Sequence, residues 1–544
     1  MQLRGHENSR RNLRVGAIIL LILGAVAIGA GSVGDAVAID RPKHLSKAFK
    51  KKELSKAKGV ELGQNPSTAN PIAGQKREPG AAALSKNALG KDALNKNALS
   101  KNALSKHTNT ASTIERRRLQ VEHRREILTT RLRLPHRPLP GERGFTGVPP
   151  LGETRFVSTE MVFQVGSNVS RQTIENAVRR LGLSTIASQN VGLTGGTLFH
   201  FRIADGRAIA DVVRALEAEN IGIAQPNYVY QLHQDANLAA RTNAGDSSQY
   251  VVNKLRLGEV HRVATGSNVL VAVIDSAIDI KHPDLAGAVV EQFNAVGRPD
   301  KPHTHGTGMV GAIAAHRKLL GIAPKAKILA IHAFSADARQ SPEATTRHII
   351  AGLEWAISKG ARVINMSFAG PYDPMLQLAM KNAHAKGVVL IAAAGNAGAK
   401  SPPLYPAADP HVIAVTATDQ NDKLFGQAVQ GPHLAVAAPG VDITVPAPDD
   451  AYQITTGTSV AAAHVSGVAA LLLERHPSVD AATILEVLTS SAKKLGPKGR
   501  DDQFGWGLVD PSSALTELDA RIADAKVATP AKPSAPRTGT VSSR

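Results

Sequence analysis

The chain has 544 residues, of which 43% are hydrophobic and none is cysteine, and its formal net charge is +19. The length leaves room for more than one domain, and the lack of cysteine excludes disulfide bonds and cysteine-ligated metal sites. The charge is concentrated at the N-terminus: residues 1–150 hold 28 Lys and Arg against 11 Asp and Glu, whereas the rest hold 36 against 34. This argues against specific nucleic-acid binding by the folded part and leaves the basic arm as a candidate contact for an anionic surface.

Residues 1–38 have the pattern of a targeting segment. Several arginines precede an uncharged run, Val15–Gly34, and the small residues Ala36–Ala38 are typical of a cleavage site. A run of this length also suffices to span a bilayer. The sequence therefore predicts a cleaved signal peptide or a membrane anchor. Either places the remainder outside the cytoplasm, as a secreted, periplasmic or membrane-anchored protein.

Residues 39–154 are expected to form a basic, low-complexity linker with little stable structure. Within it, Leu84–Lys106 repeats every five residues. Such a period advances about 140° per repeat on a helix, so the leucines do not form one stripe. We interpret the repeat as a flexible spacer, with a surface-binding or short solenoid element as the alternative. Basic residues with interspersed leucines over Arg116–Arg133 favour a helix, whose function the sequence does not show.

Residues 155–235 are expected to form a small α+β domain. Apolar residues recur at strand or helix spacing in five segments: Met161–Val165 (strand), Thr173–Leu181 (helix), Leu198–Ile203 (strand), Ala208–Leu216 (helix) and Ile221–Tyr230 (closing segment). The polar stretch that follows, up to Ser248, has no periodicity and is the expected place for proteolytic processing.

Residues 245–520 alternate between strand and helix patterns, which predicts an α/β fold with a mostly parallel, doubly wound sheet. The expected buried strands are Val269–Ile274, Ile328–Ile331, Val363–Met366, Val388–Ala392 and Val412–Val415. The expected helices are Met309–Ala315, Thr345–Ser358, Met375–Lys386, Val460–Arg475 and Ala481–Ala492. In such a fold the functional cleft lies at the carboxyl ends of the strands. Residues 521–544 are expected to be a disordered tail.

Three polar residues stand where this fold would bring them to that cleft. Asp275 follows a buried strand, and His305 precedes a small-residue helix. Ser459 begins a buried helix, where free N–H groups and the helix dipole favour a hydroxyl that acquires negative charge. An imidazole can move a proton near neutrality when a carboxylate fixes its tautomer. The residue types and their order in the chain indicate a catalytic Asp-His-Ser triad.

Four sequence blocks resemble those of the subtilases, the subtilisin-type serine proteases. They are Asp275-Ser276-Ala277 with His282-Pro283-Asp284-Leu285, His305-Gly306-Thr307-Gly308, Ala394-Gly395-Asn396-Ala397-Gly398, and Gly457-Thr458-Ser459 through Val465-Ser466-Gly467. Each block alone is weak evidence, but four in the family's order are specific. With flanking matches, the resemblance covers about 250–515.

The resemblance implies a serine endopeptidase that acts on polypeptides, with Asp275, His305 and Ser459 as the triad. It further implies that Asn396 contributes to the oxyanion hole. The backbone of Ser367, Phe368, Ala369 and Gly370 would pair with extended substrate. The α+β domain resembles the inhibitory propeptide of a zymogen, which would template the protease and then lie across its cleft until cut.

Some residues depart from the family's pattern. The family usually has Gly at Ala277, often His at Gly308, Met at Val460 and Pro at Ala463. None of these replaces a reacting group, but Ala277 and Ala463 alter backbone freedom near the site. An exported, catalytically impaired binding or scaffold protein is therefore the alternative.

No cofactor or metal is expected to be required. The sequence contains no EF-hand-like aspartate loop and no His-Glu-x-x-His pattern, although structural calcium on loops remains open. Three further histidines near the motifs, His282, His303 and His464, are interpreted as structural rather than metal ligands.

Overall fold

The computed structural model describes residues 114–130, 138–140, 142, 145–232, 249–335, 341–497 and 499–528. They all belong to one compact unit, 90–544. The targeting segment, the five-residue repeat, almost all of the expected processing stretch and the last residues of the expected tail lie outside the described residues, so those interpretations stay predictions. In the described ranges, no helix has both the length and the apolar composition needed to cross a membrane.

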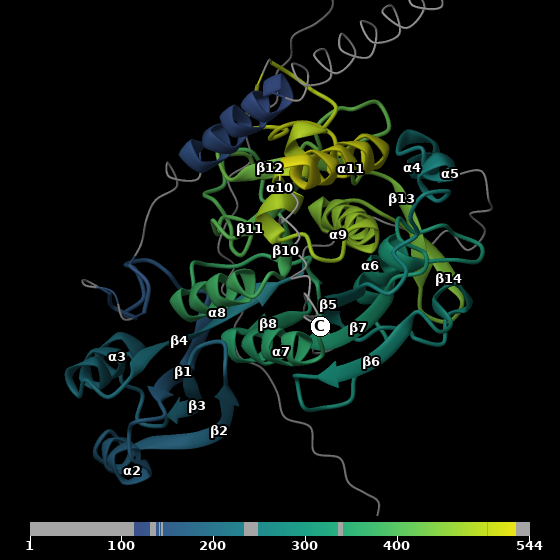
Figure 1. Ribbon diagram of the computed structural model, residues 1–544. Helices are drawn as coiled ribbons and strands as arrows, with labels where there is room; N and C mark the ends of the chain where they lie inside the picture. Colours follow the sequence, from purple (N-terminus) through teal and green to yellow (C-terminus); the bar gives the residue numbers. More distant parts are fainter. Residues whose placement is uncertain are drawn as a thin grey trace, which may run out of the picture. The chain divides into compact units, whose positions relative to one another are not determined.

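A seven-stranded sheet forms the centre of the larger part (Figure 1). Its strand order is β12-β11-β10-β9-β5-β7-β6, and every neighbouring pair is parallel. The strands are β5 (Leu270–Ser276), β6 (Val289–Asn294), β7 (Lys327–Phe334), β9 (Val363–Met366), β10 (Val389–Ala393), β11 (Val412–Thr418) and β12 (Leu434–Pro439). The predicted α/β class with a mostly parallel sheet is confirmed.

Helices cover both faces of this sheet, because its central strands are apolar on both sides. In β5, Val271 and Val273 join one core cluster while Ala272 and Ile274 join the other. The first cluster includes residues of α6 (Thr304–Ala314) and α9 (Thr458–Arg475), and the second includes residues of α7 (Thr346–Ser358) and α8 (Pro374–Ala385). The helix expected from Val460 is confirmed as α9, and it brings Ser459 to the sheet in its first turn.

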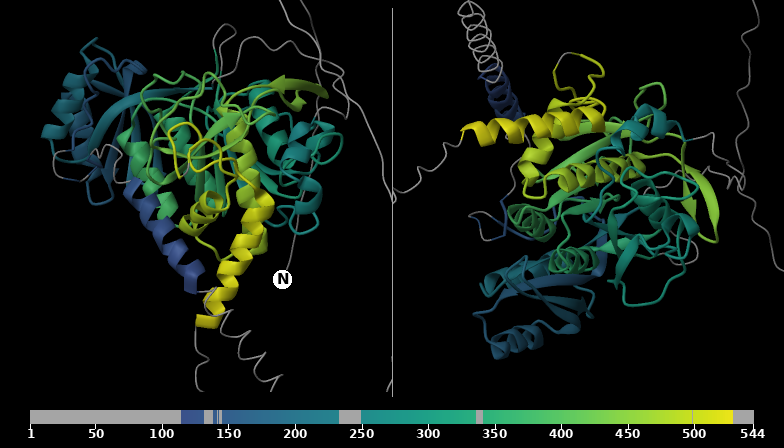
Figure 2. Two further views of the ribbon diagram at one scale, coloured as in Figure 1. Left: turned by 90° about the horizontal axis from the view of Figure 1, so that it is seen from above. Right: turned by 45° about the vertical axis from the view of Figure 1, so that its right-hand side comes forward.

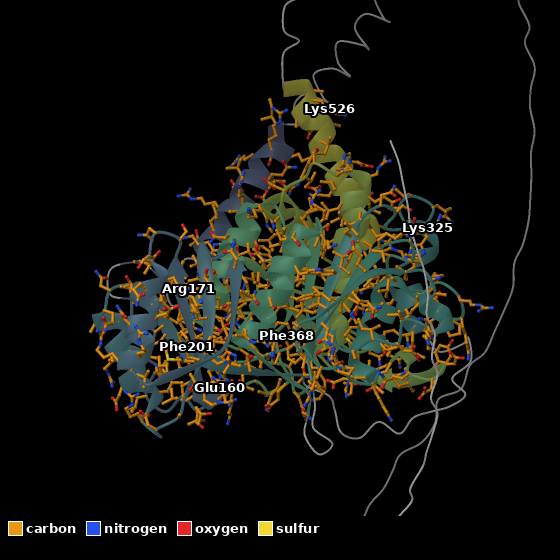
Figure 3. All side chains as sticks on the ribbon, turned by 90° about the horizontal axis from the view of Figure 1, so that it is seen from below. Glu160, Arg171, Phe201, Lys325, Phe368 and Lys526 are labelled. Carbon is orange, nitrogen blue, oxygen red and sulfur yellow. The ribbon has the colours of Figure 1, made fainter. Side chains whose placement is uncertain are left out.

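The α+β part is an antiparallel sheet with two helices. The strands are β1 (Phe156–Gly166), β2 (Leu183–Val191), β3 (Gly196–Ile203) and β4 (Ile223–Gln231), and the helices are α2 (Arg171–Arg180) and α3 (Ile209–Ala218). Its core includes the fully buried Phe201, which Figure 3 labels. The short strand β8 (Glu343–Thr345), which precedes α7, joins this sheet beside β4, in the order β2-β3-β1-β4-β8. The two parts of the chain therefore share one sheet.

Several smaller elements complete the structure. They are α4 (Tyr250–Lys254), α5 (Leu257–Val260), the 3-10 helix η2 (Pro283–Leu285), the hairpin of β13 (Ile443–Ala447) and β14 (Ala451–Thr455), α10 (Ala481–Ser490) and α11 (Pro511–Ala528). Two boundaries differ from the prediction. Residues 521–528, expected in the tail, continue α11, and residues 114–130, expected within the linker, form a helix packed against α10 and α11.

Candidate active site

Asp275 lies near the carboxyl end of β5 and is fully buried. Its carboxylate accepts hydrogen bonds from the backbone N–H of Ser276 at 2.7 Å and from the Ser276 hydroxyl at 3.0 Å. The same oxygen, Oδ1, lies 2.8 Å from Nδ1 of His305, and the second carboxylate oxygen, Oδ2, lies 2.9 Å from it. A buried carboxylate needs such donors, and here they also fix its orientation.

His305 is the second residue of α6 and is 2% exposed. Because Nδ1 faces the Asp275 carboxylate, it is the nitrogen that carries the proton, which leaves Nε2 as a proton acceptor in the neutral ring. His305 Nε2 is buried and has no hydrogen-bond partner among the described residues. His303, the N-cap of α6, accepts from the His305 backbone N–H at 3.2 Å, and burial lowers the pKa of His303, which favours this neutral, accepting form.

Ser459 is the second residue of α9 and is 6% exposed. Its hydroxyl donates to the carbonyl of Ser367 at 3.2 Å, and the Ser367 hydroxyl donates to the carbonyl of Ser459 at 2.9 Å. The Ser367 hydroxyl itself accepts from the Asn365 side chain at 2.9 Å. This reciprocal pair ties the first turn of α9 to the segment that follows β9.

Asn396 lies in the loop after β10. Its Oδ1 accepts from the backbone N–H of Thr458 at 3.1 Å and from the Thr458 hydroxyl at 2.8 Å. Its Nδ2 is buried without a hydrogen-bond partner in the described structure. Gly457 has φ +154°, and a Cβ there would meet Asn396 Nδ2 at 2.8 Å, so glycine leaves room for this amide. The amide is thus fixed beside the first turn of α9 with its N–H groups unused.

The structure brings the predicted residues together in two pairs. Asp275 bonds His305, and Asn396 bonds Thr458, the neighbour of Ser459. Helices α6 and α9, which carry His305 and Ser459, pack against each other. No hydrogen bond joins His305 to Ser459, because the Ser459 hydroxyl donates to Ser367.

Ser367–Gly370 follows β9 and pairs with the end of the α+β part. The backbone of Ala369 exchanges two hydrogen bonds with Gln231, at 3.0 and 3.1 Å. On its other side, Gln231 is aligned with Glu343 of β8. The end of β4 therefore lies as an extended strand between two strand edges of the α/β part. The sequence resemblance pointed to Ser367–Gly370, whereas β8 was not expected.

Tyr230, the neighbour of Gln231, fills a pocket beside this pairing. Its ring contacts Phe368, with centroids 5.7 Å apart, and its hydroxyl lies 3.2 Å from the buried carboxylate of Asp373. A Cβ at Gly370 would come within 2.4 Å of the Tyr230 ring, so only glycine leaves the pocket open. Figure 3 labels Phe368. Asp373 was missed from sequence, since its signal, an aspartate before Pro374, reads as an ordinary helix N-cap.

The structure bears on three of the four departures from the family pattern. Among the described non-glycine residues with positive φ, neither Ala277 nor Ala463 occurs, so alanine adds no backbone strain at either position. Gly308 lies in α6, where a Cβ would approach Val445 to 2.8 Å. A larger side chain at Gly308 would therefore require the side chain of Val445 to shift. The structure gives no account of Val460.

The remaining histidines near the motifs have ordinary structural contacts. His282 caps η2 and lies 3.1 Å from the carbonyl of Ala451, and His464 lies 2.8 Å from the carbonyl of Pro439. Within the described ranges, no group of three or more His, Cys, Asp or Glu residues could hold a metal ion. Calcium binding stays an open prediction.

Comparison with known proteins places these features in a family. The sequence model of the Subtilase family matches residues 266–507. Subtilisin E of Bacillus subtilis (strain 168) is 37% identical over 278 residues, which cover 49% of this chain and 71% of that protein. A subtilisin of Bacillus pumilus is 36% identical over 278 residues, 49% of this chain and 98% of its own length.

A third relative and a solved structure agree with this. Thermitase of Thermoactinomyces vulgaris is 36% identical over 261 residues, 46% of this chain and 91% of that protein. The crystal structure of fervidolysin from Fervidobacterium pennivorans, a keratinolytic enzyme related to subtilisin, aligns with a TM-score of 0.58 and 25% identity. That alignment covers 71% of this chain and 64% of fervidolysin, so it spans less than two thirds of that protein.

Fold, motifs and similarity together define a hydrolase of the α/β class that acts on polypeptides. The chain belongs to the subtilase family and is a subtilisin-type serine endopeptidase.

Proposed function

We propose that this protease cuts peptide bonds through an acyl-enzyme formed on Ser459. His305 Nε2 takes the Ser459 proton as the hydroxyl oxygen attacks the substrate carbonyl, and Asp275 stabilises the resulting imidazolium. His305 then gives the proton to the leaving amine, and water hydrolyses the ester by the same steps in reverse. The observation that carries this proposal is the unpaired, buried Nε2 of a histidine whose Nδ1 already bonds a carboxylate. Rotation of the Ser459 hydroxyl away from the Ser367 carbonyl would free this hydroxyl to donate its proton to His305 Nε2.

The oxyanion of the tetrahedral intermediate would be bound by Asn396 and by the backbone N–H of Ser459. Asn396 Nδ2 is a buried donor without a partner, held through its oxygen by Thr458. A preorganised donor of this kind needs no rearrangement as charge develops. The helix dipole at the first turn of α9 acts in the same direction.

The residues before the catalytic part would act as an intramolecular inhibitor, here called the pro-region (114–232). Three contacts support this: Gln231 pairs with Ala369, β4 joins β8, and Tyr230 fills the pocket at Phe368. Side chains of the pro-region also cap helices of the protease. Gln225 accepts from the backbone N–H of Met375 in α8 at 3.0 Å. An inhibitor bound in this way blocks the segment that would align a substrate.

The strand register also suggests where the chain cuts itself. Gln231 is opposite Ala369 in an antiparallel pair, so position 233 of an extended substrate would align with Ser367. The carbonyl of Ser367 is the group that now accepts the Ser459 hydroxyl. We therefore expect self-cleavage directly after residue 233.

Export of the protein and a contact of its basic arm with an anionic surface belong to the same proposal. Export is supported by the pattern of residues 1–38 and by similarity to a relative named Minor extracellular protease Epr, which is 34% identical over 258 residues and is matched over 39% of its length. The arm itself lies outside the described residues.

The test is N-terminal sequencing of the purified protein beside Ser459→Ala, together with hydrolysis of an unstructured protein such as casein. We expect the wild type to begin at residue 234 and to hydrolyse casein, and Ser459→Ala to keep its pro-region and to be inactive. A common shortened N-terminus in both proteins would exclude self-cleavage. A correctly processed wild type without any hydrolysis would favour the impaired scaffold.

A further inference from the structure

The helix over 114–130 lies against elements that contribute nothing to the candidate active site. Figure 2 shows it beside α11, and its contacts are with α10, α11 and Trp506. Only four of its side chains are turned from solvent: Gln120, His123, Ile127 and Thr130. Their spacing of three, four and three residues is that of a single helix face. The helix therefore docks along one stripe.

An apolar contact forms the centre of this stripe. Ile127 is 7% exposed and belongs to the same core cluster as Trp506 and Leu485. The His123 ring meets the Trp506 ring edge-on, with centroids 4.3 Å apart, and His123 Nε2 lies 2.8 Å from the hydroxyl of Thr489 in α10. Without the helix, Trp506 and its neighbours would lose this cover.

Complementary charges flank the apolar contact. Two arginines of the helix face acidic side chains of α10 and α11: Arg124 lies 2.9 Å from Glu486, and Arg116 lies 3.3 Å from Asp524. Arg117 donates to the backbone carbonyl of Asp524 at 2.6 Å. Exposed ion pairs contribute little individually, but they fix the orientation of the helix on the surface.

We propose that the helix 114–130 is a second docking element of the pro-region, which keeps the severed pro-region on the protease. The proposal rests on the proposed function for the cleavage itself. Once the chain is cut in the stretch that follows Leu232, β4 and the helix over 114–130 remain on one fragment. This fragment contacts two separate surfaces of the enzyme. Release then requires both contacts to open together, since the bound one keeps the other at high effective concentration.

The docking is tested first in uncut, full-length Ser459→Ala protein by amide hydrogen exchange. Ile127→Asp places a charge in the apolar contact, and His123→Ala removes the contact with Trp506 more mildly. Leu128→Asp is the matched control, because Leu128 is on the same helix and 54% exposed. We expect exchange in 114–130 to be at least about tenfold faster in the first two variants and unchanged in the control. Equal exchange in all variants overturns the docking.

The consequence is tested in active full-length protein by following the cleaved fragment on size-exclusion chromatography and the appearance of activity. In the wild type and Leu128→Asp, the fragment should co-elute with the protease and delay activity. In Ile127→Asp it should separate, and activity should appear at least about tenfold sooner. If the stretch after Leu232 is cut but the three proteins release the fragment alike, the second anchor is refuted. If this stretch is never cut, self-processing fails instead, and the exchange result alone decides the docking.

Discussion

The most informative single residues of the site are His305 and Asn396, each of which buries a polar atom that has no partner in the described structure. Leaving such an atom unpaired costs about 1–3 kcal/mol, a cost that a hydrogen bond formed during the reaction would remove. Both are fixed from the other end of the side chain, by Asp275 and by Thr458. We interpret both atoms as groups kept free for the reaction. Asn396 Nδ2 would bind the substrate oxyanion, and His305 Nε2 would accept the Ser459 proton.

The first prediction at this scale concerns the oxyanion hole. Asn396→Ala removes a preorganised donor, which typically contributes about 2.7–4 kcal/mol to the transition state. We expect kcat for a peptide substrate to fall about a hundred- to a thousandfold with little change in KM. Thr458→Ala, which only loosens Asn396, should cost less. Equal kcat in wild type and Asn396→Ala would remove Asn396 from the mechanism.

A second prediction concerns substrate choice in the pocket that Tyr230 occupies. A substrate tyrosine there can bond the buried Asp373 as Tyr230 does, whereas phenylalanine leaves that carboxylate one donor short. Since a hydrogen bond to a charged group is worth about 1.5–3 kcal/mol, kcat/KM should favour tyrosine at the fourth residue before the cut by about tenfold or more. Substitutions at the third residue, whose counterpart Gln231 has an exposed side chain, are the control. A preference for phenylalanine would contradict this reading of the pocket.

Among the secondary-structure elements, the buried ones could be predicted from sequence. β9 has the predicted bounds, Val363–Met366. A short apolar run between two turns is typical of a strand that is buried on both faces. β6 was missed since four of its six residues are exposed at the sheet edge. The hairpin of β13 and β14 was missed as well, and Pro446 in β13 weakens the strand signal. α11 was not among the expected helices, and the predicted start of the tail at residue 521 falls inside it because its second half is polar.

An element-scale prediction follows from the environment of His123 on the docked helix. Burial, then the positive charges of Lys494 and Arg521, lower the pKa of His123 to about 4. Undocked, the ring should titrate near its ordinary value of about 6.5, so between these values only the undocked helix binds a proton. Docking should therefore be strongest above pH 6.5 and weaken as the pH falls towards 4, roughly thirtyfold by pH 5.

The measurement is retention of the cut pro-region on size-exclusion chromatography at pH 8 and pH 5. Other charged side chains at this contact are Arg124, which pairs with Glu486, Glu126, which acts electrostatically on Lys494, and Glu517, which pairs with Arg521. His123→Gln cannot titrate and serves as the control, so its retention should vary less with pH than that of the wild type. Identical pH profiles for the two proteins would show that other groups govern release.

Contacts between distant parts of the chain organise the whole molecule. The sequence therefore indicated the residues of the proposed site better than the contacts by which the pro-region would inhibit it. The four motif blocks pointed to Asp275, His305, Asn396 and Ser459 as candidates, because each block combines a polar residue with the small residues that position it. Nothing local predicts that β4 pairs with β8 or that Tyr230 enters a pocket with Asp373, since these contacts join segments more than 100 residues apart. The helix over 114–130 was expected from the basic, leucine-containing segment Arg116–Arg133, but its docking against α10 and α11 could not be predicted for the same reason.

The central claim is that Ser459 is the nucleophile activated by His305 and Asp275. The most direct measurement is labelling of the processed enzyme with a fluorophosphonate, followed by peptide mass mapping. We expect one label per molecule, on Ser459, and at least about a thousandfold slower labelling of His305→Ala whose pro-region has been removed by added wild-type enzyme, because the hydroxyl then lacks its base. A label on another residue, or labelling of His305→Ala at the wild-type rate, would contradict the proposed catalytic triad.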